Sequence, residues 1–246
     1  MANPYHYPAG DSRGGQFAPK GTDVIVSLNA KFGKDVIESR SETITEVLGD
    51  LTGKCRVDDI KKERRALEKM SEPDYIDYLK ITTSEAKTTG DLRENINGLI
   101  SLETRVKSPS STYEKIYERE KYGSVSELSD ILRYTSIKDK DTYTKSVKKD
   151  ISKMKKLGYV VIKQTNYWKD TTTGYNGINY CLLSPDGVKV ELQFHTEESH
   201  SCKETELHRL YEQERVEKDP IKKKELQLEQ IRVGSKVSMP DNVHTI

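Results

Sequence analysis

The second half of the chain alternates between the hydrophobic spacing of strands and that of helices. In residues 188–194 every second side chain is apolar, which is the period of a strand with one buried face. The segment follows Ser184-Pro185-Asp186-Gly187, a good turn sequence, so residues 177–183 and 188–194 are predicted to form a hairpin. Between residues 143 and 157 the apolar positions have helical spacing, and Gly158 ends the pattern.

The same criteria assign the remaining elements of this half. Strands are also predicted over residues 102–107, 130–137 and 159–162, and helices over residues 112–122 and 197–217. Strands that alternate with helices, together with a hairpin, indicate an α+β domain in which helices flank a mixed β-sheet.

The first hundred residues have a different pattern. Apolar residues such as Leu48, Leu51, Leu67 and Met70 recur at spacings near three, four and seven, which predicts a helical region. Residues 1–22 are rich in proline and glycine and have little apolar surface to bury, so we expect a disordered arm. The predicted organisation is an arm (1–22), a helical region (23–99), the α+β domain (100–217) and a charged tail (218–246).

Charge and cysteine content narrow the class of protein. The chain has 41 basic and 40 acidic residues and a net charge of +1, which argues against a general nucleic-acid coat protein. Its three cysteines lack paired spacing, so a disulfide framework or zinc site is not expected. No apolar run approaches the roughly 20 residues that span a bilayer. These features predict a protein of a reducing compartment such as the cytoplasm, without a membrane partner.

Basic residues surround a predicted strand, loop and helix. Arg105 and Lys107 end the strand, a serine-rich loop containing Ser111 follows, and Lys115 lies on the next helix. A helix N-terminus offers free N–H groups to an anion, and the cations add positive charge around it. The segment is therefore a candidate for holding a triphosphate, although a solvated basic patch is the commoner meaning of such a pattern.

Carboxylates begin or line two of the predicted strands. Asp130 opens one strand and Arg133 follows it; the aspartate is either a strand-entry cap or a metal ligand. Along residues 188–195, Glu191, Gln193 and His195 alternate with the apolar residues and share one face. That face is either the wet side of a sheet or a metal–phosphate site.

A third feature is the loop that contains Gly174 and Tyr175. It lacks apolar anchors, so we expect the tyrosine ring to lie outside the core, where it is able to stack on a base.

Taken in order, these segments resemble the synthetase domain of the RelA/SpoT family of alarmone synthetases, over about residues 100 to 215. The shared features are the Arg-x-Lys strand, the serine loop with its Lys-bearing helix, the Asp-opening strand, the Gly-Tyr loop and the Glu-x-Gln-x-x-Thr strand. The chain departs from the long members where the loop continues Asn176-Gly177-Ile178-Asn179 instead of Arg-Ser-Leu-His. In this loop the chain is more similar to the small toxin-type members, and the identity of the acceptor is left open.

The resemblance implies a nucleotidyltransferase-like synthetase fold and a pyrophosphokinase that acts on ATP and a guanosine or adenosine nucleotide (GDP, GTP, AMP, ADP or ATP), with tRNA as the alternative acceptor. It implies that Asp130 and Glu191 are catalytic and bind Mg²⁺. It further implies the following binding roles: for the ATP phosphates, Arg105, Lys107, Ser111, Lys115 and Arg133; for the acceptor, Tyr175, Asn179, Gln193 and His195.

The resemblance to toxin-type members also implies inhibition of growth in the cytoplasm of a bacterial host, and an antitoxin or immunity partner that binds the N-terminal region. Two alternatives remain at this stage. A transferase of nucleoside monophosphates would need a Gly-Ser and Asp-x-Asp pattern, which the sequence lacks. A non-catalytic phage structural protein is favoured slightly by the arm, since residues 9–20 look like linkers of phage head proteins; a virion partner would follow from it.

Overall fold

The computed structural model describes residues 57–119, 123–170 and 172–246, with the side chains of residues 57–60 and 119 left aside. They form two compact units. The first contains residues 57–83 and 106–128, and the second contains residues 84–105 and 129–246. The predicted arm and the first part of the predicted helical region lie outside the described residues. Each unit is described by itself.

The first unit consists of helices. Helices α3 (Val57–Lys69) and α4 (Glu72–Thr83) are followed, after the chain has passed through the second unit, by α6 (Pro109–Tyr113). Helix α6 continues into a π-helical turn, Glu114–Arg119, and a short 3₁₀ turn, Val125–Glu127, ends the unit. The side chain of Asp74 on α4 connects two of these elements, since it accepts from the Tyr117 hydroxyl and from Val125 N (2.8 Å).

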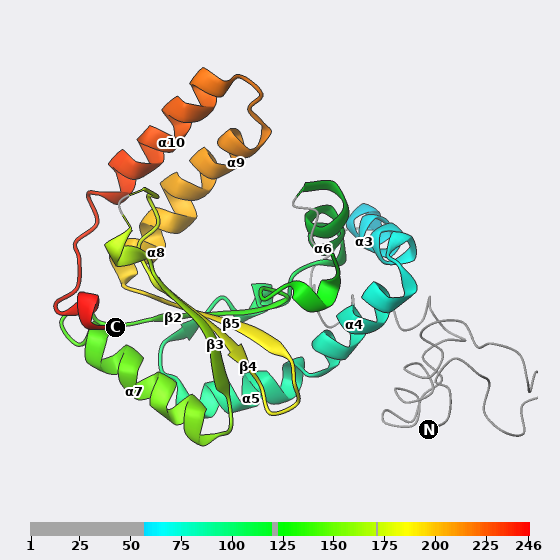
Figure 1. Ribbon diagram of the computed structural model, residues 1–246, viewed down its shortest axis with the longest axis horizontal. Coiled ribbons are helices and arrows are strands. Elements are labelled where there is room, and N and C mark those ends of the chain that lie inside the picture. Colours follow the sequence, from blue (N-terminus) through cyan, green and yellow to red (C-terminus); the bar gives the residue numbers. More distant parts are fainter. Residues whose placement is uncertain (1–56, 120–122, 171) are drawn as a thin grey trace, which may run out of the picture. The chain divides into compact units, whose positions relative to one another are not determined.

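The second unit is built on a five-stranded sheet in the order β1-β2-β5-β4-β3. Its strands are β1 (Leu99–Ile100), β2 (Leu132–Ile137), β3 (Val160–Asn166), β4 (Ile178–Leu183) and β5 (Lys189–His195). Strands β2 and β5 are parallel and the other neighbours antiparallel, so the sheet is mixed, as predicted (Figure 1). The predicted hairpin is β4–β5, and its turn contains Gly187 at φ 77°.

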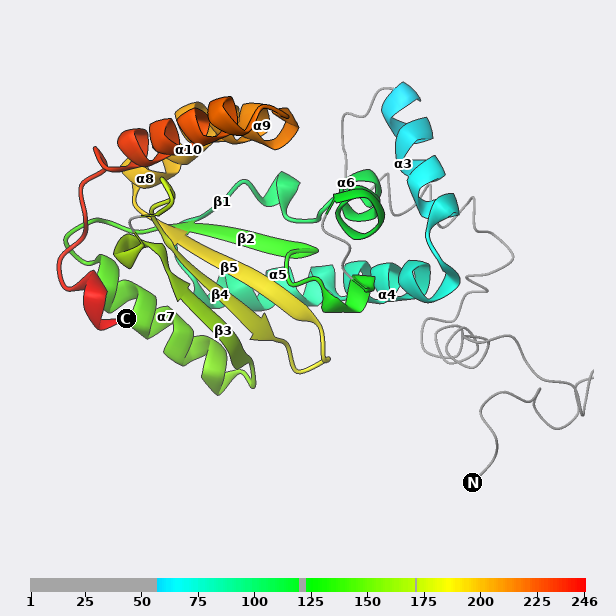
Figure 2. The ribbon, with the colours of Figure 1, turned by 45° about the horizontal axis from the view of Figure 1, so that its top comes forward.

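Helices α5 (Glu85–Asn95) and α7 (Tyr143–Lys156) cover one face of this sheet (Figures 1 and 2). The face is apolar because the alternate residues Val190, Leu192 and Phe194 of β5 are fully buried against it. Buried polar contacts add to this packing. Tyr134 of β2 shares a hydrogen bond with Thr89 of α5 (2.8 Å), and the Lys138 ammonium pairs with Asp150 of α7 (2.6 Å).

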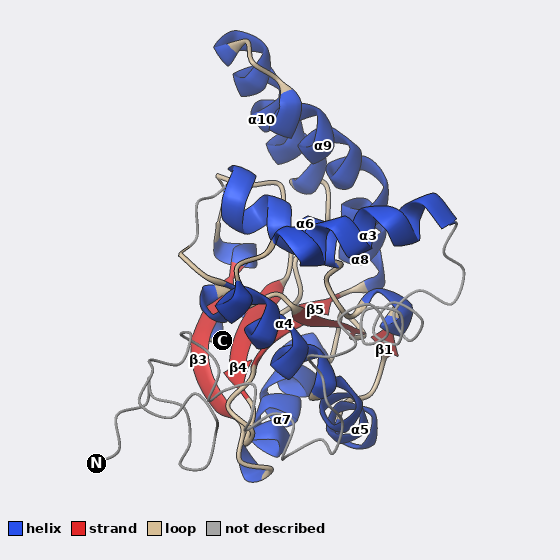
Figure 3. Ribbon diagram, turned by 90° about the vertical axis from the view of Figure 1, so that its right-hand side faces the viewer, coloured by secondary structure: helices blue, strands red, loops and turns tan. Residues whose placement is uncertain are grey.

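The chain after β5 is helical to near its end. Helix α8 (Glu197–Cys202) continues through a π-helical turn, Lys203–Leu207, into α9 (His208–Val216). Helix α10 (Pro220–Gly234) then returns beside α9, and the 3₁₀ turn Val243–Thr245 ends the chain (Figure 1). Figure 3 shows α9 and α10 as an adjacent pair. No helix within the described ranges combines the length and apolar character that crossing a membrane requires.

Two sequence predictions differ from the structure. Residues 102–107 are not a strand: Leu102–Thr104 form a 3₁₀ turn after Ser101, whose φ is 51°, and the strand that pairs with β2 is β1, just before it. The expected charged tail, residues 218–246, contains α10. That helix begins in the usual way, with the Asp219 side chain accepting from Ile221 N and Pro220 at the first turn.

Candidate functional site

The polar face of the sheet is centred on Glu191 of β5. Glu191 is the register partner of Arg133 on β2 and of Cys181 on β4. Register partners on neighbouring strands point to the same face, so these three side chains form a row across the middle of the sheet. Arg133 is exposed and Glu191 is partly exposed, which leaves this row accessible from solvent.

Two neutral amides hold the Glu191 carboxylate. Asn179 Nδ2 donates to Oε1 (3.2 Å), and Gln193 Nε2 donates to Oε2 (3.0 Å). The Lys203 ammonium in turn donates to Gln193 Oε1 (3.3 Å), which fixes the orientation of that amide. The carboxylate is therefore oriented by its neighbours.

Tyr175 lies next to this network and is held by the fold. Its hydroxyl group is 2.9 Å from Asn179 Oδ1 and 2.8 Å from His195 Nε2. Its ring packs edge-on against Tyr167 (4.8 Å between centroids) and His195 (5.1 Å). Burial and then the nearby Glu191 carboxylate raise the pKa of the Tyr175 hydroxyl well above 10, so this group stays protonated at neutral pH. The expectation of a ring free of the core, drawn from the loop composition, is wrong.

His195 occupies a different place from the one expected. The sequence prediction gives it a contact with an acceptor phosphate, but the side chain is fully buried. Its Nε2 faces Tyr175, and its Nδ1 lies 3.1 Å from the Ser199 hydroxyl on α8. Burial, then the charges of Lys203 and His200, lower its pKa to about 3. His195 is therefore a neutral residue that supports Tyr175 from behind.

Asp130 lies in the segment that leads into β2. Because β2 and β5 are parallel and Leu132 pairs with Val190, Asp130 approaches the edge of the sheet where β5 also begins. Carboxylate oxygens are the protein ligands that Mg²⁺ prefers, and Mg²⁺ bound with a nucleotide needs only one or two of them. The resemblance assigns this role to Asp130 and Glu191. In the described part of the chain there is no group of three or more His, Cys, Asp or Glu side chains that could hold a metal ion.

Arg105, at the end of the predicted basic strand, forms an ion pair with Glu85 of α5. Thr89 donates to the same carboxylate. Burial acts in the opposite direction, but the hydrogen bonds from Arg105 and Thr89 lower the pKa of Glu85, so the pair stays charged. Sequence reasoning gave Glu85 no role in the site, because nothing in the helical pattern of α5 distinguishes it from Glu94, the other glutamate of that helix.

The other three predicted phosphate ligands, Lys107, Ser111 and Lys115, belong to the helical unit. The expected free N-terminus of their helix is occupied by an internal carboxylate. Ser110 donates to buried Glu63 of α3 through its backbone nitrogen and its hydroxyl group, both at 2.7 Å. The backbone nitrogen of Ser111 donates to the Ser108 side chain (3.2 Å). The prediction of an open anion site at this helix end is therefore wrong, and the side chains of Lys107 and Lys115 remain the candidates there.

A cavity of about 400 Å³ adjoins Tyr175. The loop, the turn after α8 and the two last helices all contribute to it, through Thr173, Gly174, Tyr175, Lys203, Glu204, Leu207, His208, Tyr211, Glu214 and Gln230. Its lining combines the two tyrosine rings with an imidazole, a cation, an amide and two carboxylates, and the rings with the amide suit a planar polar ligand such as a base.

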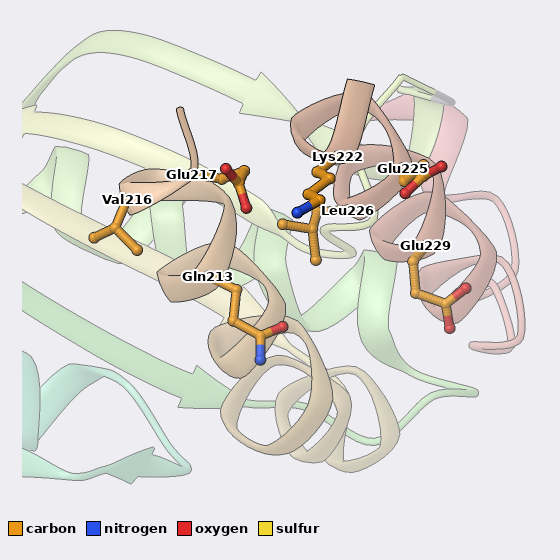
Figure 4. A pocket seen from close by; sticks show the side chains of 7 residues that line it. All are labelled: Gln213, Val216, Glu217, Lys222, Glu225, Leu226 and Glu229. Carbon is orange, nitrogen blue, oxygen red and sulfur yellow. The ribbon is translucent and has the colours of Figure 1, made fainter. Parts of the chain in front are cut away.

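A larger groove of about 670 Å³ lies between α9 and α10 (Figure 4). Its lining includes Glu217, Glu225 and Glu229 with only one cation, Lys222, and contains no aromatic ring. Three carboxylates would repel a phosphate-bearing ligand. The smaller cavity also has more carboxylates, Glu204 and Glu214, than cations, so charge alone does not separate the two. The larger groove has no ring for a base to stack on and shares no lining residue with the Glu191 face, so the smaller cavity is the better candidate for a nucleotide.

Sequence reasoning missed several residues around this cavity. Lys203, Tyr211 and Gln230 lie on helices that were read only as a charged amphipathic segment and a tail. The Asp219-Pro220 helix start was a readable signal for α10, but no local signal indicates that Gln230 packs beside Tyr175, because that proximity is set by the return of the chain.

The fold and this face together define an α+β domain with a carboxylate-bearing polar face and an adjoining aromatic cavity. Residues 104–216 match the family described as the region found in RelA / SpoT proteins. The match spans just under half of the chain and includes every residue predicted for the site. The chain therefore carries a RelA/SpoT-type region, which confirms the resemblance seen in the sequence. No curated protein matches the chain in sequence.

Solved structures are similar in fold. The type VI effector Tas1, solved in complex with its immunity protein, has a TM-score of 0.50 at 18% identity, and the match covers 69% of this chain and 100% of that one. A GTP pyrophosphokinase family protein from Streptococcus pneumoniae has a TM-score of 0.43 at 19% identity, with 65% and 84% covered. The small alarmone synthetase 1 from Bacillus subtilis bound to pppGpp has 0.39 at 19%, with 63% and 86% covered. The likeness to Tas1 shows a shared fold, and the two weaker similarities add nothing to that conclusion.

Proposed function

We propose that this protein transfers pyrophosphate from ATP to the ribose 3′-hydroxyl of a guanosine or adenosine nucleotide. The observation that carries the proposal is the Glu191 carboxylate, held by Asn179 and Gln193 beside Tyr175 and Arg133 in a RelA/SpoT-type region. A wet sheet face without a function would not need its central carboxylate oriented by two amides and a lysine.

In the proposed step the acceptor hydroxyl oxygen attacks the β-phosphorus of ATP. The new oxygen–phosphorus bond forms, the bond from the β-phosphorus to the bridging oxygen of the α-phosphate breaks, and AMP leaves with that oxygen. The hydroxyl proton passes to the Glu191 carboxylate. Such transfers depend mainly on positioning and on stabilising charge at the phosphate oxygens.

The predicted residues divide between the two substrates. In the sheet-containing unit, Arg105 and Arg133 are proposed to bind the ATP phosphates, with Arg105 exchanging its contact with Glu85 for one with the nucleotide. In the helical unit, Lys107 and Lys115 are proposed as phosphate ligands. Ser111 is proposed to contribute through its hydroxyl group, because its backbone nitrogen already donates to Ser108. A guanidinium is well suited to both phosphates and ring faces.

For the acceptor, the ring of Tyr175 is proposed to stack on the base in the 400 Å³ cavity. Asn179 and Gln193 orient Glu191, and His195 orients Tyr175, so these three contribute by positioning. This replaces the acceptor-binding role that the resemblance implies for all three, and for His195 the reason is that a side chain with no exposed surface has no access to an acceptor phosphate.

Asp130 and Glu191 would hold a Mg²⁺ ion that accompanies ATP. When bound, the ion supplies positive charge that neutralises the phosphate oxygens. The chain's own part would be to supply the two carboxylates, Asp130 from the segment before β2 and Glu191 from β5.

The test is to incubate the protein with labelled ATP and each of GDP, GTP, AMP, ADP and tRNA. AMP release with a pyrophosphorylated acceptor supports the proposal, and release of pyrophosphate instead would favour transfer of a nucleoside monophosphate. Glu191→Gln and Asp130→Asn should each lower the rate by at least ~100-fold, since loss of charge stabilisation dominates such chemistry. Glu225→Gln, the same change at an exposed site on α10, is the control and should keep the wild-type rate. Silence with every acceptor would reject the function.

A growth-inhibiting role follows from the same activity. Production of the wild-type chain in bacterial cytoplasm should slow growth, and Glu191→Gln should restore it at equal protein levels. An antitoxin or immunity partner is then proposed to bind and block this activity. Normal growth with abundant wild-type protein would count against the toxin role while leaving the enzymatic proposal to the assay above.

One observation favours tRNA as an alternative acceptor. A groove of about 450 Å³ in the helical unit is lined by four cations of α3, namely Lys61, Lys62, Arg65 and Lys69. Tyr113 and other residues complete its lining. The Lys69 ammonium lies 5.8 Å from the centroid of the Tyr113 ring. Cations beside an aromatic ring suit a nucleic-acid backbone, although Glu114 and Glu118 also line the groove. A salt-sensitive pyrophosphorylation of tRNA, lost when Lys62 and Arg65 are both replaced by Ala, would identify this acceptor.

A further inference from the structure

Helix α10 lies outside the RelA/SpoT-type region and packs directly on the loop that carries Tyr175. The contact is between backbones. A Cβ atom on Gly174 would lie 2.0 Å from the Gln230 carbonyl oxygen, and a Cβ on Gly234 would lie 2.0 Å from the Gly174 carbonyl oxygen. Real Cβ contacts are never this short, so the loop and the end of the helix approach each other only because both positions are glycine.

A side-chain hydrogen bond closes the same contact. Asn176 Nδ2 donates to the Gly234 carbonyl (2.8 Å) and to the Gly174 carbonyl (3.2 Å). The last carbonyls of a helix have no partner within the helix, so the asparagine satisfies one of them. The loop residues on both sides of Tyr175 are therefore attached to one point, the C-terminal end of α10.

Helix α10 is itself firmly placed. Leu207 at the end of the π-helical turn, Leu210 of α9 and Val233 in the last turn of α10 form a buried apolar cluster. Glu214 of α9 accepts from both Gln227 Nε2 (2.8 Å) and Gln230 Nε2 (3.0 Å) of α10. The helix is thus a rigid support for the loop, and Gln230 adds to the wall of the cavity beside Tyr175.

We propose that α10 is a positioning element for the acceptor half of the site, and that it acts through the contact of Gly234 with Gly174 and Asn176. The inference rests on the proposed function. Holding the loop in one conformation removes the ordering cost that a mobile loop would incur when the acceptor binds. The contact orients the ring that lines the cavity and leaves the ATP-binding cations untouched, so it acts on acceptor affinity and turnover with the acceptor, and not on the binding of ATP.

The test compares Gly234→Ala with Gly90→Ala. Both replace a helix glycine, but a Cβ on Gly90 of α5 meets nothing within 4 Å. In Gly234→Ala the loop has to move by more than an ångström, and displacements of that size cost up to ~100-fold in rate. We expect acceptor affinity, measured by calorimetry with GDP and AMP, to fall at least ~10-fold while ATP affinity stays within ~2-fold. Gly90→Ala should leave both unchanged.

Hydrogen exchange separates this inference from the proposed function. Amides of residues 172–177 should exchange faster in Gly234→Ala than in the wild-type protein, whether or not any acceptor is turned over. If the wild-type protein lacks activity, the proposed function fails and the exchange result still decides whether α10 fixes the loop. Unchanged exchange and acceptor affinity in Gly234→Ala would overturn the inference, and so would equal losses of ATP and acceptor binding. Should that variant fail to fold, Asn176→Ala, which removes two hydrogen bonds without a steric clash, decides by the same readouts.

Discussion

Acidification should destabilise the sheet-containing unit through His195. The side chain is fully buried and neutral, with a pKa lowered to about 3 by burial and by the charges of Lys203 and His200. In the unfolded chain the same imidazole titrates at about 6.5. The perturbation is therefore simple: lowering the pH from about 7.5 to about 5 protonates His195 in the unfolded state only.

The sign and size follow from linkage between protonation and folding. Because the folded pKa is depressed, the unfolded state binds more protons below pH ~6.5, so this stability is present above that pH and is lost as the pH falls. Each pH unit between the two pKa values contributes ~1.4 kcal/mol. At pH ~5 the loss is about 2 kcal/mol, and it changes little if the folded pKa is a unit higher or lower, because pH ~5 lies well above it.

Urea unfolding is the natural assay, since Trp168 is the single tryptophan and is buried in this unit. The free energy of unfolding is measured at both pH values for the wild-type protein and for His195→Gln. The variant is less stable at every pH because it loses the contacts of the ring with Tyr175 and Ser199, but its loss on acidification should be smaller than that of the wild-type protein by about 2 kcal/mol. His244→Gln, the same change at an exposed position, should lose as much unfolding free energy on acidification as the wild-type protein.

The outcome that refutes this reasoning is equal acid sensitivity of the wild-type protein and His195→Gln, within ~0.5 kcal/mol. That result would mean that His195 is accessible to protons in the folded state. It would also remove the argument that His195 supports Tyr175 as a neutral residue.

Three further results are expected. Tyr175→Ala should weaken acceptor binding by roughly 5- to 150-fold and spare ATP in separate calorimetric titrations, since stacking contributes ~1–3 kcal/mol. Tyr175→Phe, which keeps the ring but loses the hydroxyl contacts, should bind acceptors nearly as well and be ~1 kcal/mol less stable in urea. A Tyr175→Ala variant that loses ATP affinity and keeps acceptor affinity would contradict the stacking role. Glu63→Ala should destabilise the helical unit by ~1–3 kcal/mol in urea, because the buried Ser110 donors lose their acceptor, and Glu63→Gln should cost less; an unchanged midpoint in the alanine variant would argue against the cap. Asp150→Asn should cost ~3–5 kcal/mol in thermal unfolding by leaving the buried Lys138 ammonium without its carboxylate, whereas a cost below ~1 kcal/mol would show that the pair is solvated.

The sequence was a good guide where local rules and burial agree. The hairpin β4–β5 follows from alternation around a turn with glycine at its left-handed position. Helix α7 ends at Lys156, two residues before Gly158, whose φ is 88°. The prediction failed at residues 102–107, because a 3₁₀ turn interrupts the segment. A backbone hydrogen bond from Arg133 N to the Arg105 carbonyl (2.7 Å) joins it to β2, but the paired edge strand is Leu99–Ile100. A two-residue strand has no periodicity to recognise.

The sequence indicated which residues belong to the candidate site, and the structure changed the contacts that several of them make. Spacing placed Glu191 and Gln193 on one face, which the register confirms. The same spacing said nothing of the depth at which His195 lies, since an alternating strand shows which face a side chain points to and not what covers that face. The cover is α8, through Ser199, and the loop of Tyr175.

By itself the sequence determined the α+β class, most of the strands and helices, the order of the chemical segments and the RelA/SpoT resemblance, because all of these depend on residue type and on spacing along the chain. Only the tertiary structure decided that Glu63 fills the helix end expected to bind phosphate, that Glu85 holds Arg105, and that α10 returns to fix the loop of Tyr175. These contacts join residues 20 to 60 positions apart in the chain. They are set by how the helices pack on the sheet and on one another, which no local pattern of hydrophobic and polar residues records.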